Sequence, residues 1–200
     1  MKVLDLCSGL GGFSEAFIAA GHEVLRIENN PLLANVANTK EMCIFEFRDW
    51  IEDNLIINPF EDVDVILFSP PCYEFSLAFN APKATHLRER PGIPYEPDMS
   101  ILDCGMNIIE LLRPRYHIVE NVRGASPHFS ELLGKPRQIN GAYFFWGNFP
   151  SFSPAAFPSK AEKDERHSPL RANVRGRIPI EISVAILRAI ETQKSILDYC

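Results

Sequence analysis

The first thirteen residues constrain the fold more than any other stretch of this sequence. An apolar run from Lys2 to Leu6 is typical of a buried strand, and Gly9-Leu10-Gly11-Gly12 follows it almost directly. An amphipathic helix is expected next, from Ser14 to Ala20. A strand, a glycine turn and a helix in this order bring backbone N–H groups and a helix N-terminus close to a bound ligand. We therefore expect an α/β protein with a ligand site at the end of its first strand.

Strand patterns and helix patterns alternate along the rest of the chain. Further strands are predicted over residues Glu23–Ile27, Cys43–Phe47, Val63–Phe68, Arg115–Val119 and Ala142–Trp146. Helices are predicted over Leu32–Thr39, Met99–Leu112 and Ile180–Lys194. This alternation favours one doubly wound, mostly parallel sheet. The segment from Leu77 to Pro97 holds four prolines and is expected to be a long functional or mobile loop.

Composition narrows the class of protein. The chain has 200 residues, which suits a single domain over residues 1–200, and 46% of them are hydrophobic. It contains no apolar run long enough to span a bilayer, and its first residues enter a strand pattern rather than a signal peptide. Five scattered cysteines without CxxC spacing favour reduced thiols and no metal site. We expect an intracellular, cytoplasmic protein.

The formal net charge of −6 argues against a whole surface that grips nucleic acid, although a local basic patch could still do so. One such patch runs from Ser159 to Arg177, within a short basic segment at about residues 148–177. A charge run of this kind is usually a solvated loop, so the two interpretations stay equally open.

The glycine turn alone is weak evidence for a cofactor, because tight strand-to-helix connections also use glycine. Two acidic residues strengthen the case. Glu28 follows the second predicted strand and suits a ribose, and Asp49 follows the third and could accept a hydrogen bond from an adenine amino group. The turn lacks the basic residue of a P-loop and the full dinucleotide spacing. The pattern favours a nucleoside cofactor without a triphosphate, with S-adenosyl-L-methionine as the candidate.

A cysteine follows the predicted strand Val63–Phe68, within Pro70-Pro71-Cys72. Ligands bind at the carboxyl ends of strands in open α/β sheets, and a cysteine held there by prolines is a plausible nucleophile. A lone cysteine is more often a buried structural thiol. The proline context and the acidic Glu120, which follows the next strand, favour the catalytic interpretation over the structural one.

Three stretches together resemble the motifs of the DNA (cytosine-5) methyltransferase family. They are Asp5 to Phe13, Ser69 to Ser76, and Glu120-Asn121-Val122, and they occur in the family's order. Gly176-Arg177-Ile178-Pro179 is faintly similar to the family's last motif. The resemblance covers about residues 3 to 190. It implies a Rossmann-like, doubly wound, mostly parallel sheet of the S-adenosylmethionine-dependent methyltransferase type.

The resemblance also implies a mechanism. The Cys72 thiolate would add to carbon 6 of cytosine and make carbon 5 nucleophilic enough to attack the methyl group. Glu120 would donate a proton at ring nitrogen 3, because a carboxyl in a partly dry site can have a raised pKa. Asn121 belongs to the same motif. The residue that removes the carbon 5 proton is not assigned, and water is the expected base. A duplex cytosine would have to be flipped, unless the enzyme acts on single strands.

The resemblance predicts two further sets of residues. Cofactor contacts are expected from the glycine turn and from later strand ends, at Leu6, Cys7, Ser8, Gly9, Leu10, Gly11, Gly12, Phe13, Glu28, Asn29, Asp49, Trp50 and Pro70. Contacts to DNA are expected from the loop after Cys72 and from nearby cations, at Phe75, Ser76, Arg88, Arg90, Arg123 and Arg137.

The chain departs from the family in three places. Tyr73 stands where the family usually has glutamine, the stretch 136–147 keeps only Arg137 clearly, and residues 148–177 are short for a target-recognition domain. We therefore expect low sequence specificity, a specificity partner protein, or a minimal form of the kind carried by phages and other mobile elements, associated with nucleoid or viral DNA. RNA as the substrate and a non-catalytic regulatory subunit remain alternatives.

Overall fold

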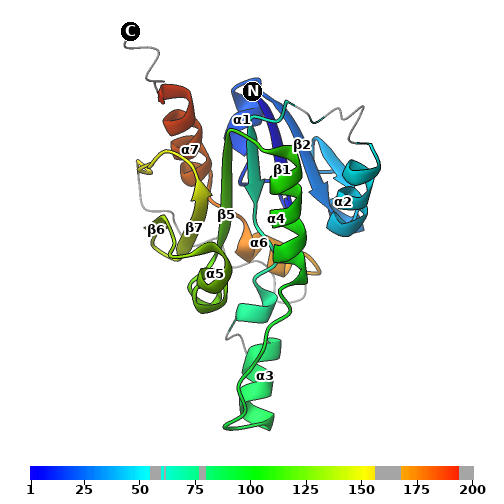
Figure 1. Cartoon of the computed structure of the whole chain (residues 1–200), viewed down its shortest axis with the longest axis vertical. Helices are drawn as coiled ribbons and strands as arrows, with labels where there is room; N and C mark the ends of the chain where they lie inside the picture. The colour runs from blue at the N-terminus through cyan, green and yellow to red at the C-terminus, as the bar shows by residue number, and fades with distance from the viewer. Residues whose placement is uncertain (55–59, 61, 77–79, 156–167, 194–200) are drawn as a thin grey trace.

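The computed structural model describes residues 1–54, 60, 62–76, 80–155 and 168–193. Its centre is a seven-stranded sheet in the order β3-β2-β1-β4-β5-β7-β6. The strands are β1 (Lys2–Leu6), β2 (Glu23–Glu28), β3 (Thr39–Glu41), β4 (Val65–Phe68), β5 (Tyr116–Val122), β6 (Gln138–Asn140) and β7 (Tyr143–Asn148). The first five strands in this order are parallel, whereas β7 is antiparallel to both β5 and β6. The predicted doubly wound, mostly parallel sheet is confirmed (Figure 1).

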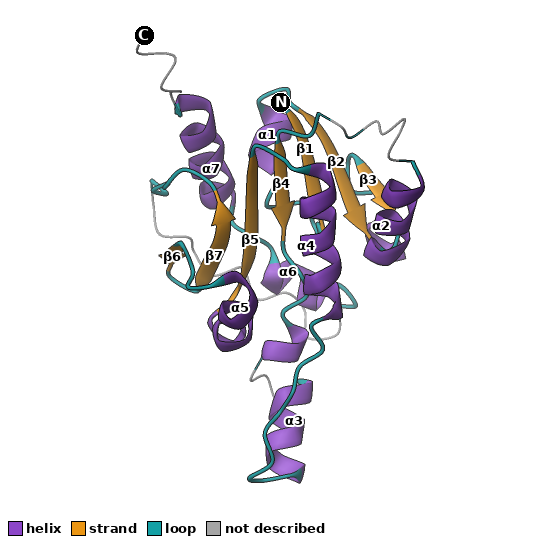
Figure 2. Ribbon diagram, viewed as in Figure 1, coloured by secondary structure: helices purple, strands orange, loops and turns teal. Residues whose placement is uncertain are grey.

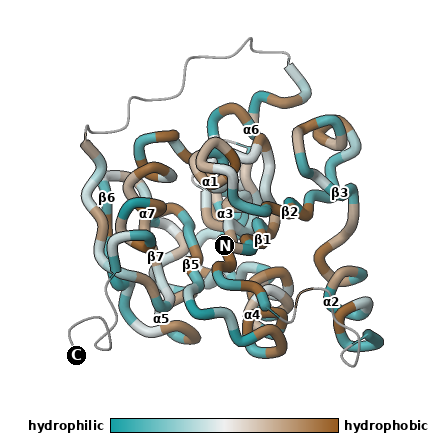
Figure 3. Tube along the Cα trace, turned by 90° about the horizontal axis from the view of Figure 1, so that it is seen from above, coloured by the Kyte–Doolittle hydropathy of each residue, from teal (hydrophilic) through white to brown (hydrophobic). Residues whose placement is uncertain are grey.

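The central strands are apolar on both faces, as expected for strands that helices cover on both sides. On one face, Leu4 and Ile66 pack with α2 (Ile44–Asp53), α4 (Ser100–Leu112) and α5 (Ser126–Leu133). On the other face, Val3 and Leu67 pack with α1 (Glu15–Ala19) and α7 (Ile180–Thr192). Figure 3 shows these two helical layers on opposite sides of the sheet.

Parallel pairing places the carboxyl ends of β1, β4 and β5 at one edge of the sheet. The loops that leave these ends carry the glycine turn, the Cys72 stretch and the short 3₁₀ helix η4 (Arg123–Ala125). A second 3₁₀ helix, η3 (Tyr73–Phe75), follows Cys72 directly. Helix α6 (Arg171–Gly176) lies at the same edge (Figure 2). The three segments that resemble family motifs therefore meet although they are far apart in the sequence.

The prediction for residues 32 to 47 was wrong. Residues Leu32–Thr39 do not form a helix, because only the 3₁₀ turn η1 (Pro31–Leu33) forms and the chain then turns into β3. Residues Cys43–Phe47 do not form a strand either. Ile44, Phe47 and Ile51 are buried at helical spacing, and Cys43 caps helix α2 in a reciprocal arrangement in which its N–H donates to Glu46 Oε2 at 3.1 Å.

The long loop predicted after Cys72 is partly helical. Helix α3 (Pro82–Glu89) begins at a proline, whose fixed backbone angle suits the first helical position. Residues 80–97, which we call the α3 arm, project beyond the carboxyl edge of the sheet (Figure 1). The sequence patterns also missed β6 and α5, and β5 extends to Val122, so that Glu120 lies within the strand.

The described residues also bear on membrane-spanning helices, metal-binding groups and the state of the cysteines. Among the described helices, none is long and apolar enough to cross a membrane. Within the same described ranges, no group of three or more His, Cys, Asp or Glu side chains is placed to hold a metal ion. Four of the cysteines, Cys7, Cys43, Cys72 and Cys104, are free thiols.

Candidate active site

The loop after β4 holds Cys72 in a defined position. Pro70 is buried, and its carbonyl oxygen accepts a 2.9 Å hydrogen bond from Asn121 Nδ2. Phe75 is also buried, with its ring edge-on to Phe129 at 5.3 Å. These contacts fix the loop on both sides of Cys72, whose own side chain is only partly buried. The thiol is thus anchored by its neighbours and remains accessible.

Glu120 lies beside this loop, in the last part of β5. Its side chain is buried, and its Oε2 accepts a 2.8 Å hydrogen bond from Ser69 Oγ. Burial raises the pKa of the Glu120 carboxyl to about 7, although the hydrogen bond from Ser69 acts in the opposite direction. A substantial fraction of Glu120 therefore carries a proton near neutral pH. Ser69 opens the stretch that resembles a family motif, but the sequence patterns indicated no role for it in the site.

Opposing contributions act on the pKa of the Cys72 thiol. Burial raises the pKa of the Cys72 thiol, and the negative charge of Glu120 raises it further. The Cys72 backbone and the positive charge of Arg175, which lies on α6, lower the same pKa. Charges from two other parts of the chain, Glu120 on β5 and Arg175 on α6, therefore act on the Cys72 thiol.

The glycine turn is joined to β2 through Glu28. Glu28 Oε2 accepts a 2.7 Å hydrogen bond from the Gly9 N–H, and its Oε1 accepts one of 3.0 Å from the Asn30 N–H. Each carboxylate oxygen has a second lone pair that stays available to a ligand. Gly9 and Gly11 adopt φ values of +55° and +73°, which favour glycine strongly.

A network of buried polar side chains supports this turn from the protein interior. The sequence patterns did not predict this network. Arg26, on β2, donates to the Gly11 carbonyl at 2.7 Å and to Ser14 Oγ at 2.9 Å. Ser14 Oγ in turn donates to Asp5 Oδ2 at 2.6 Å. Burial raises the pKa of Asp5 to about 7, whereas Ser14 and Arg26 act to lower it. The network fixes the shape of the turn from inside the protein.

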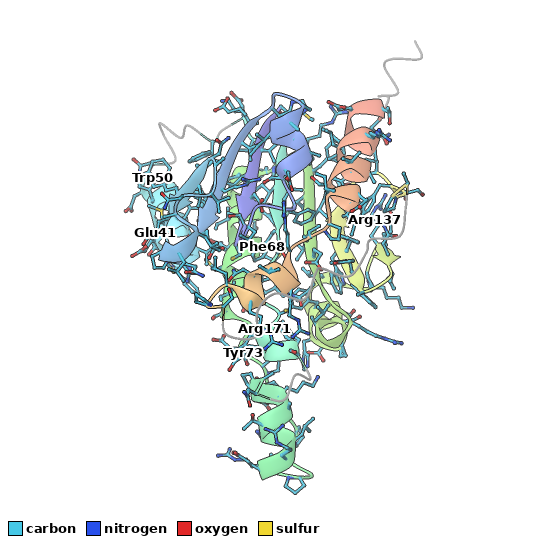
Figure 4. The ribbon with its side chains drawn as sticks, turned by 180° about the vertical axis from the view of Figure 1, so that it is seen from behind. Glu41, Trp50, Phe68, Tyr73, Arg137 and Arg171 are labelled. Atoms are coloured by element: carbon cyan, nitrogen blue, oxygen red, sulfur yellow. The ribbon has the colours of Figure 1, made fainter. Side chains whose placement is uncertain are left out.

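Asp49 and Trp50 do not lie at the end of a strand, and their predicted positions were wrong. Both are on α2, which leads away from the carboxyl edge, and the Asp49 carboxylate accepts hydrogen bonds from the neighbouring Arg48. Trp50 packs against Phe47 and Phe60. Figure 4 shows Trp50 well removed from Tyr73 at the Cys72 loop. The residues that follow β3 toward this edge are Met42 and Cys43 instead.

The predicted DNA contacts are dispersed. Phe75 and Ser76 follow Cys72 directly, Arg123 is exposed at the start of η4, and Arg88 and Arg90 are exposed on the α3 arm. Arg137 lies apart from these residues, because its guanidinium sits over the Phe149 ring at 5.5 Å near β6 and β7. Figure 4 separates Arg137 clearly from Arg171 and Tyr73. Lys160, Lys163 and Arg166 of the basic segment lie outside the described residues.

Comparison with known families agrees with the motif resemblance. The family model for C-5 cytosine-specific DNA methylases matches residues 1–134, which hold the glycine turn, Cys72 and Glu120. The chain belongs to this family. Membership explains why the sheet, the glycine turn and the cysteine loop occur together in one chain, and it confirms the fold predicted from the motifs.

The relatives with names are Type II methyltransferases. M1.HphI of Haemophilus parahaemolyticus is 30% identical over 144 residues, which cover 68% of this chain and 36% of the relative. M.AplI of Arthrospira platensis is 33% identical over 131 residues, covering 62% of this chain and 32% of the relative. M.AquIA of Picosynechococcus is 27% identical over 132 residues, which cover 62% of this chain and 49% of the relative. The chain thus spans about a third to a half of these proteins.

Two solved structures align with part of this chain. A prophage-encoded protein of E. coli, described as a DNA modification methyltransferase, aligns with a TM-score of 0.47 at 21% identity, over 74% of this chain and 46% of the other. A DNMT2 mutant from Spodoptera frugiperda aligns with a TM-score of 0.37 at 23% identity, over 62% of this chain and 36% of the other. The family assignment depends on the sequence match and not on these alignments.

Proposed function

We propose that this protein transfers a methyl group from S-adenosyl-L-methionine to carbon 5 of cytosine in DNA. The observation that carries the proposal is the hydrogen-bonded junction between the ends of β4 and β5. Ser69 bonds to Glu120 and Pro70 bonds to Asn121, so that the thiol-bearing loop and the buried carboxyl are held together. A nucleophile and a proton donor held side by side are what addition to a pyrimidine ring requires.

In this proposal Cys72 is the nucleophile. Its sulfur forms a bond to carbon 6 of the target cytosine as the double bond between carbons 5 and 6 breaks. The electron pair becomes available at carbon 5, which then attacks the donor methyl group. Negative charge that builds up on the ring during the addition is relieved by a proton at nitrogen 3.

Glu120 is the proposed donor of that proton. A carboxyl whose pKa is about 7 is partly protonated near neutral pH, whereas an ordinary glutamate is almost fully ionised there. Asn121 has a positioning role in this proposal, because its side chain holds Pro70 in place and its own Oδ1 accepts a 2.9 Å bond from the Val122 N–H.

The residues of the glycine turn fit S-adenosyl-L-methionine, which supplies the electrophilic methyl group when bound. Glu28 retains lone pairs for ribose hydroxyls. The buried Ser8 Oγ has no hydrogen-bond partner among the described residues. A Cβ atom built at Gly9 would meet only Asn173, at 3.9 Å, so that a ligand can approach the Gly9 backbone. We assign the cofactor to Leu6–Phe13, Glu28, Asn29 and Pro70, without Asp49 or Trp50.

DNA is the proposed substrate because the matching family model describes C-5 cytosine-specific DNA methylases. The α3 arm, with Arg88 and Arg90, and the exposed Arg123 would contact the duplex around the flipped base. Residues 1–200 form a single catalytic domain in this proposal. A partner protein would supply most of the sequence specificity, because residues 148–177 are short for a target-recognition domain.

Methyl transfer from a labelled cofactor tests the function. Purified protein should label cytosine in DNA and should form a covalent adduct with DNA that contains 5-fluorocytosine at the target position. Cys72→Ser should abolish both signals, whereas Cys104→Ala, which removes a thiol from the core, should retain them if the variant remains folded. Labelling of matched RNA but not of DNA would reassign the substrate. Cofactor binding without an adduct on a broad panel of sequences would contradict the proposal.

A further inference from the structure

The α3 arm and the 3₁₀ helix η3 enclose a pocket that the proposed methyl transfer does not use. Its volume is about 460 Å³, which lies within the range of ligand sites in proteins. The lining includes Tyr73, Asn80, His86, Glu89, Arg90 and Tyr95. Figure 4 shows Tyr73 where the arm meets the body of the protein. Because Tyr73 directly follows Cys72, the pocket begins one residue from the proposed nucleophile.

Hydrogen bonds hold the two tyrosines of this lining at their hydroxyl ends. The Tyr73 hydroxyl donates to the Asn80 carbonyl at 3.3 Å, so its ring reaches from η3 to the start of the arm. The Tyr95 hydroxyl donates to the carboxylate of Glu74, which also lies on η3. Tyr73 is nevertheless 59% exposed. Its ring is therefore positioned by the protein while much of the ring surface stays open to a planar ligand.

His86 adds a third ring to the lining. It lies 5.4 Å from the Tyr95 ring at an angle of 60°, and its Nε2 donates to the Ile93 carbonyl at 3.1 Å. This bond ties the segment after α3 back onto the helix. The pocket is thus built by contacts among η3, α3 and the returning segment of the arm.

The charged groups of the lining suit a nucleobase better than a phosphate. Arg90 brings a positive charge, but Glu89 brings a negative charge to the same pocket. A base is neutral and planar, stacks on aromatic rings, and carries hydrogen-bond donors and acceptors on its edges. A carboxylate can accept a hydrogen bond from an exocyclic amino group, which adenine, guanine and cytosine carry and thymine lacks.

We propose that this pocket binds an unstacked DNA base next to the target cytosine and favours a base with an exocyclic amino group. The inference rests on the proposed function, because it takes the target cytosine to be the base held at Cys72. Neighbouring Cα atoms, such as those of Cys72 and Tyr73, are about 3.8 Å apart, close to the roughly 3.4 Å rise between bases of one strand. A nucleotide beside the target would therefore arrive at the pocket.

Equilibrium binding to a library of DNA duplexes tests the inference without cofactor or turnover. Each duplex has one central cytosine with randomised neighbours on both sides, and the bound duplexes are sequenced. The wild type should disfavour thymine at one neighbouring position by about fivefold or more. Glu89→Ala should reduce this discrimination to less than about twofold, because the acceptor for the amino group is lost. Glu96→Ala is the matched control, since it removes an equal charge from an exposed position of the same arm outside the pocket lining, and it should keep the wild-type preference.

An abasic sugar at the selected position separates a base site from a phosphate site, because it removes the base and keeps the phosphate. It should weaken binding to the wild type by at least about fivefold. Tyr73→Ala should bind the intact and the abasic duplex with less than about a twofold difference, because the stacking ring is gone. Tyr73→Phe keeps the ring and should distinguish the two duplexes as the wild type does.

Three results would overturn the inference. They are a folded wild type with no preference at either neighbouring position, an equal loss of preference in Glu96→Ala and Glu89→Ala, and an abasic effect that persists in Tyr73→Ala. Methyl transfer by the wild type is measured in parallel. Transfer without a neighbouring-base preference would remove this inference alone, whereas a preference that depends on Glu89, without transfer, would remove the proposed function alone.

Discussion

Ser69 and Glu120 are joined across the ends of two neighbouring strands by a 2.8 Å hydrogen bond from the serine hydroxyl to the buried carboxyl group. The bond has a chemical consequence as well as a structural one. It favours the ionised carboxylate, whereas burial favours the protonated acid, and burial is the larger effect. The protonation of Glu120 is thus poised near neutral pH by two opposing contributions from its surroundings.

Removal of the serine hydroxyl should shift this balance. In Ser69→Ala the pKa of Glu120 should rise further, because the donor that stabilises its carboxylate is lost. The alkaline limb of the pH profile for methyl transfer, which reports loss of the Glu120 proton, should then move to higher pH. The variant should also lose about 1 kcal/mol of unfolding free energy. Ser151→Ala, at an exposed loop position, is the control and should change neither quantity.

Glu120→Gln should make stability less dependent on pH. The folded-state pKa of about 7 lies above the ordinary value of 4.5, so the stability contribution of Glu120 is fully present below pH 4.5 and is lost as the pH rises through 7. Replacement with glutamine should remove this loss, which amounts to at most roughly 3 kcal/mol. Urea unfolding at pH 5 and pH 8 measures the difference.

The pKa of Asp5 is also raised, to about 7. The Glu120→Gln variant should therefore keep part of the dependence of stability on pH. Methyl transfer should fall in Glu120→Gln over the whole pH range. A variant with the same stability difference between pH 5 and pH 8 as the wild type would show that Glu120 is not the group that titrates.

Gly11→Ala should damage both the fold and the cofactor site. An added Cβ would lie 2.2 Å from the Arg26 Cζ atom, and the φ of +73° is strained for alanine. Gly21→Ala is the matched control, because Gly21 has a similar φ of +81° but nothing within 4 Å of its added Cβ. We expect Gly11→Ala to lose at least about 2 kcal/mol more stability than Gly21→Ala. Thermal unfolding and cofactor titration of both variants measure the difference.

Cofactor titration should also separate Glu28 from Asp49. Glu28→Gln should weaken S-adenosyl-L-methionine binding by about tenfold or more, because the carboxylate loses its charge beside the glycine turn. Asp49→Asn should change the affinity by less than about twofold, since this carboxylate lies on α2 and pairs with Arg48. A large effect of Asp49→Asn with a small effect of Glu28→Gln would contradict the proposed cofactor site.

The position of Cys72 and Glu120 at one edge could be predicted because buried apolar strands precede both residues, and parallel strands end on the same side. Asp49 was misplaced for a local reason. Residues 44–47 combine isoleucine and two phenylalanines, and so short an apolar run does not distinguish a strand from the first turn of a helix. Only the burial of Ile51, one turn later, identifies α2 as a helix.

The buried network and the charge on α6 could not be predicted in this way. Arg26 follows Val24 and Leu25 and precedes Ile27 in β2, yet its partners Gly11 and Ser14 become evident only once β1 and β2 are paired. Arg175 belongs to a stretch with many cations. Its relation to Cys72 depends on how α6 packs on the glycine turn, which no local pattern determines.

The parallel arrangement of β1, β4 and β5 has a consequence for engineering this protein. Every loop of the candidate site leaves the carboxyl edge, whereas the turns before β2 and β5, at residues 20–22 and 113–115, lie at the opposite edge (Figure 1). New chain termini, affinity tags or fluorescent reporters could therefore be inserted at these two turns, with the full length of the sheet between the insertion and the reactive thiol.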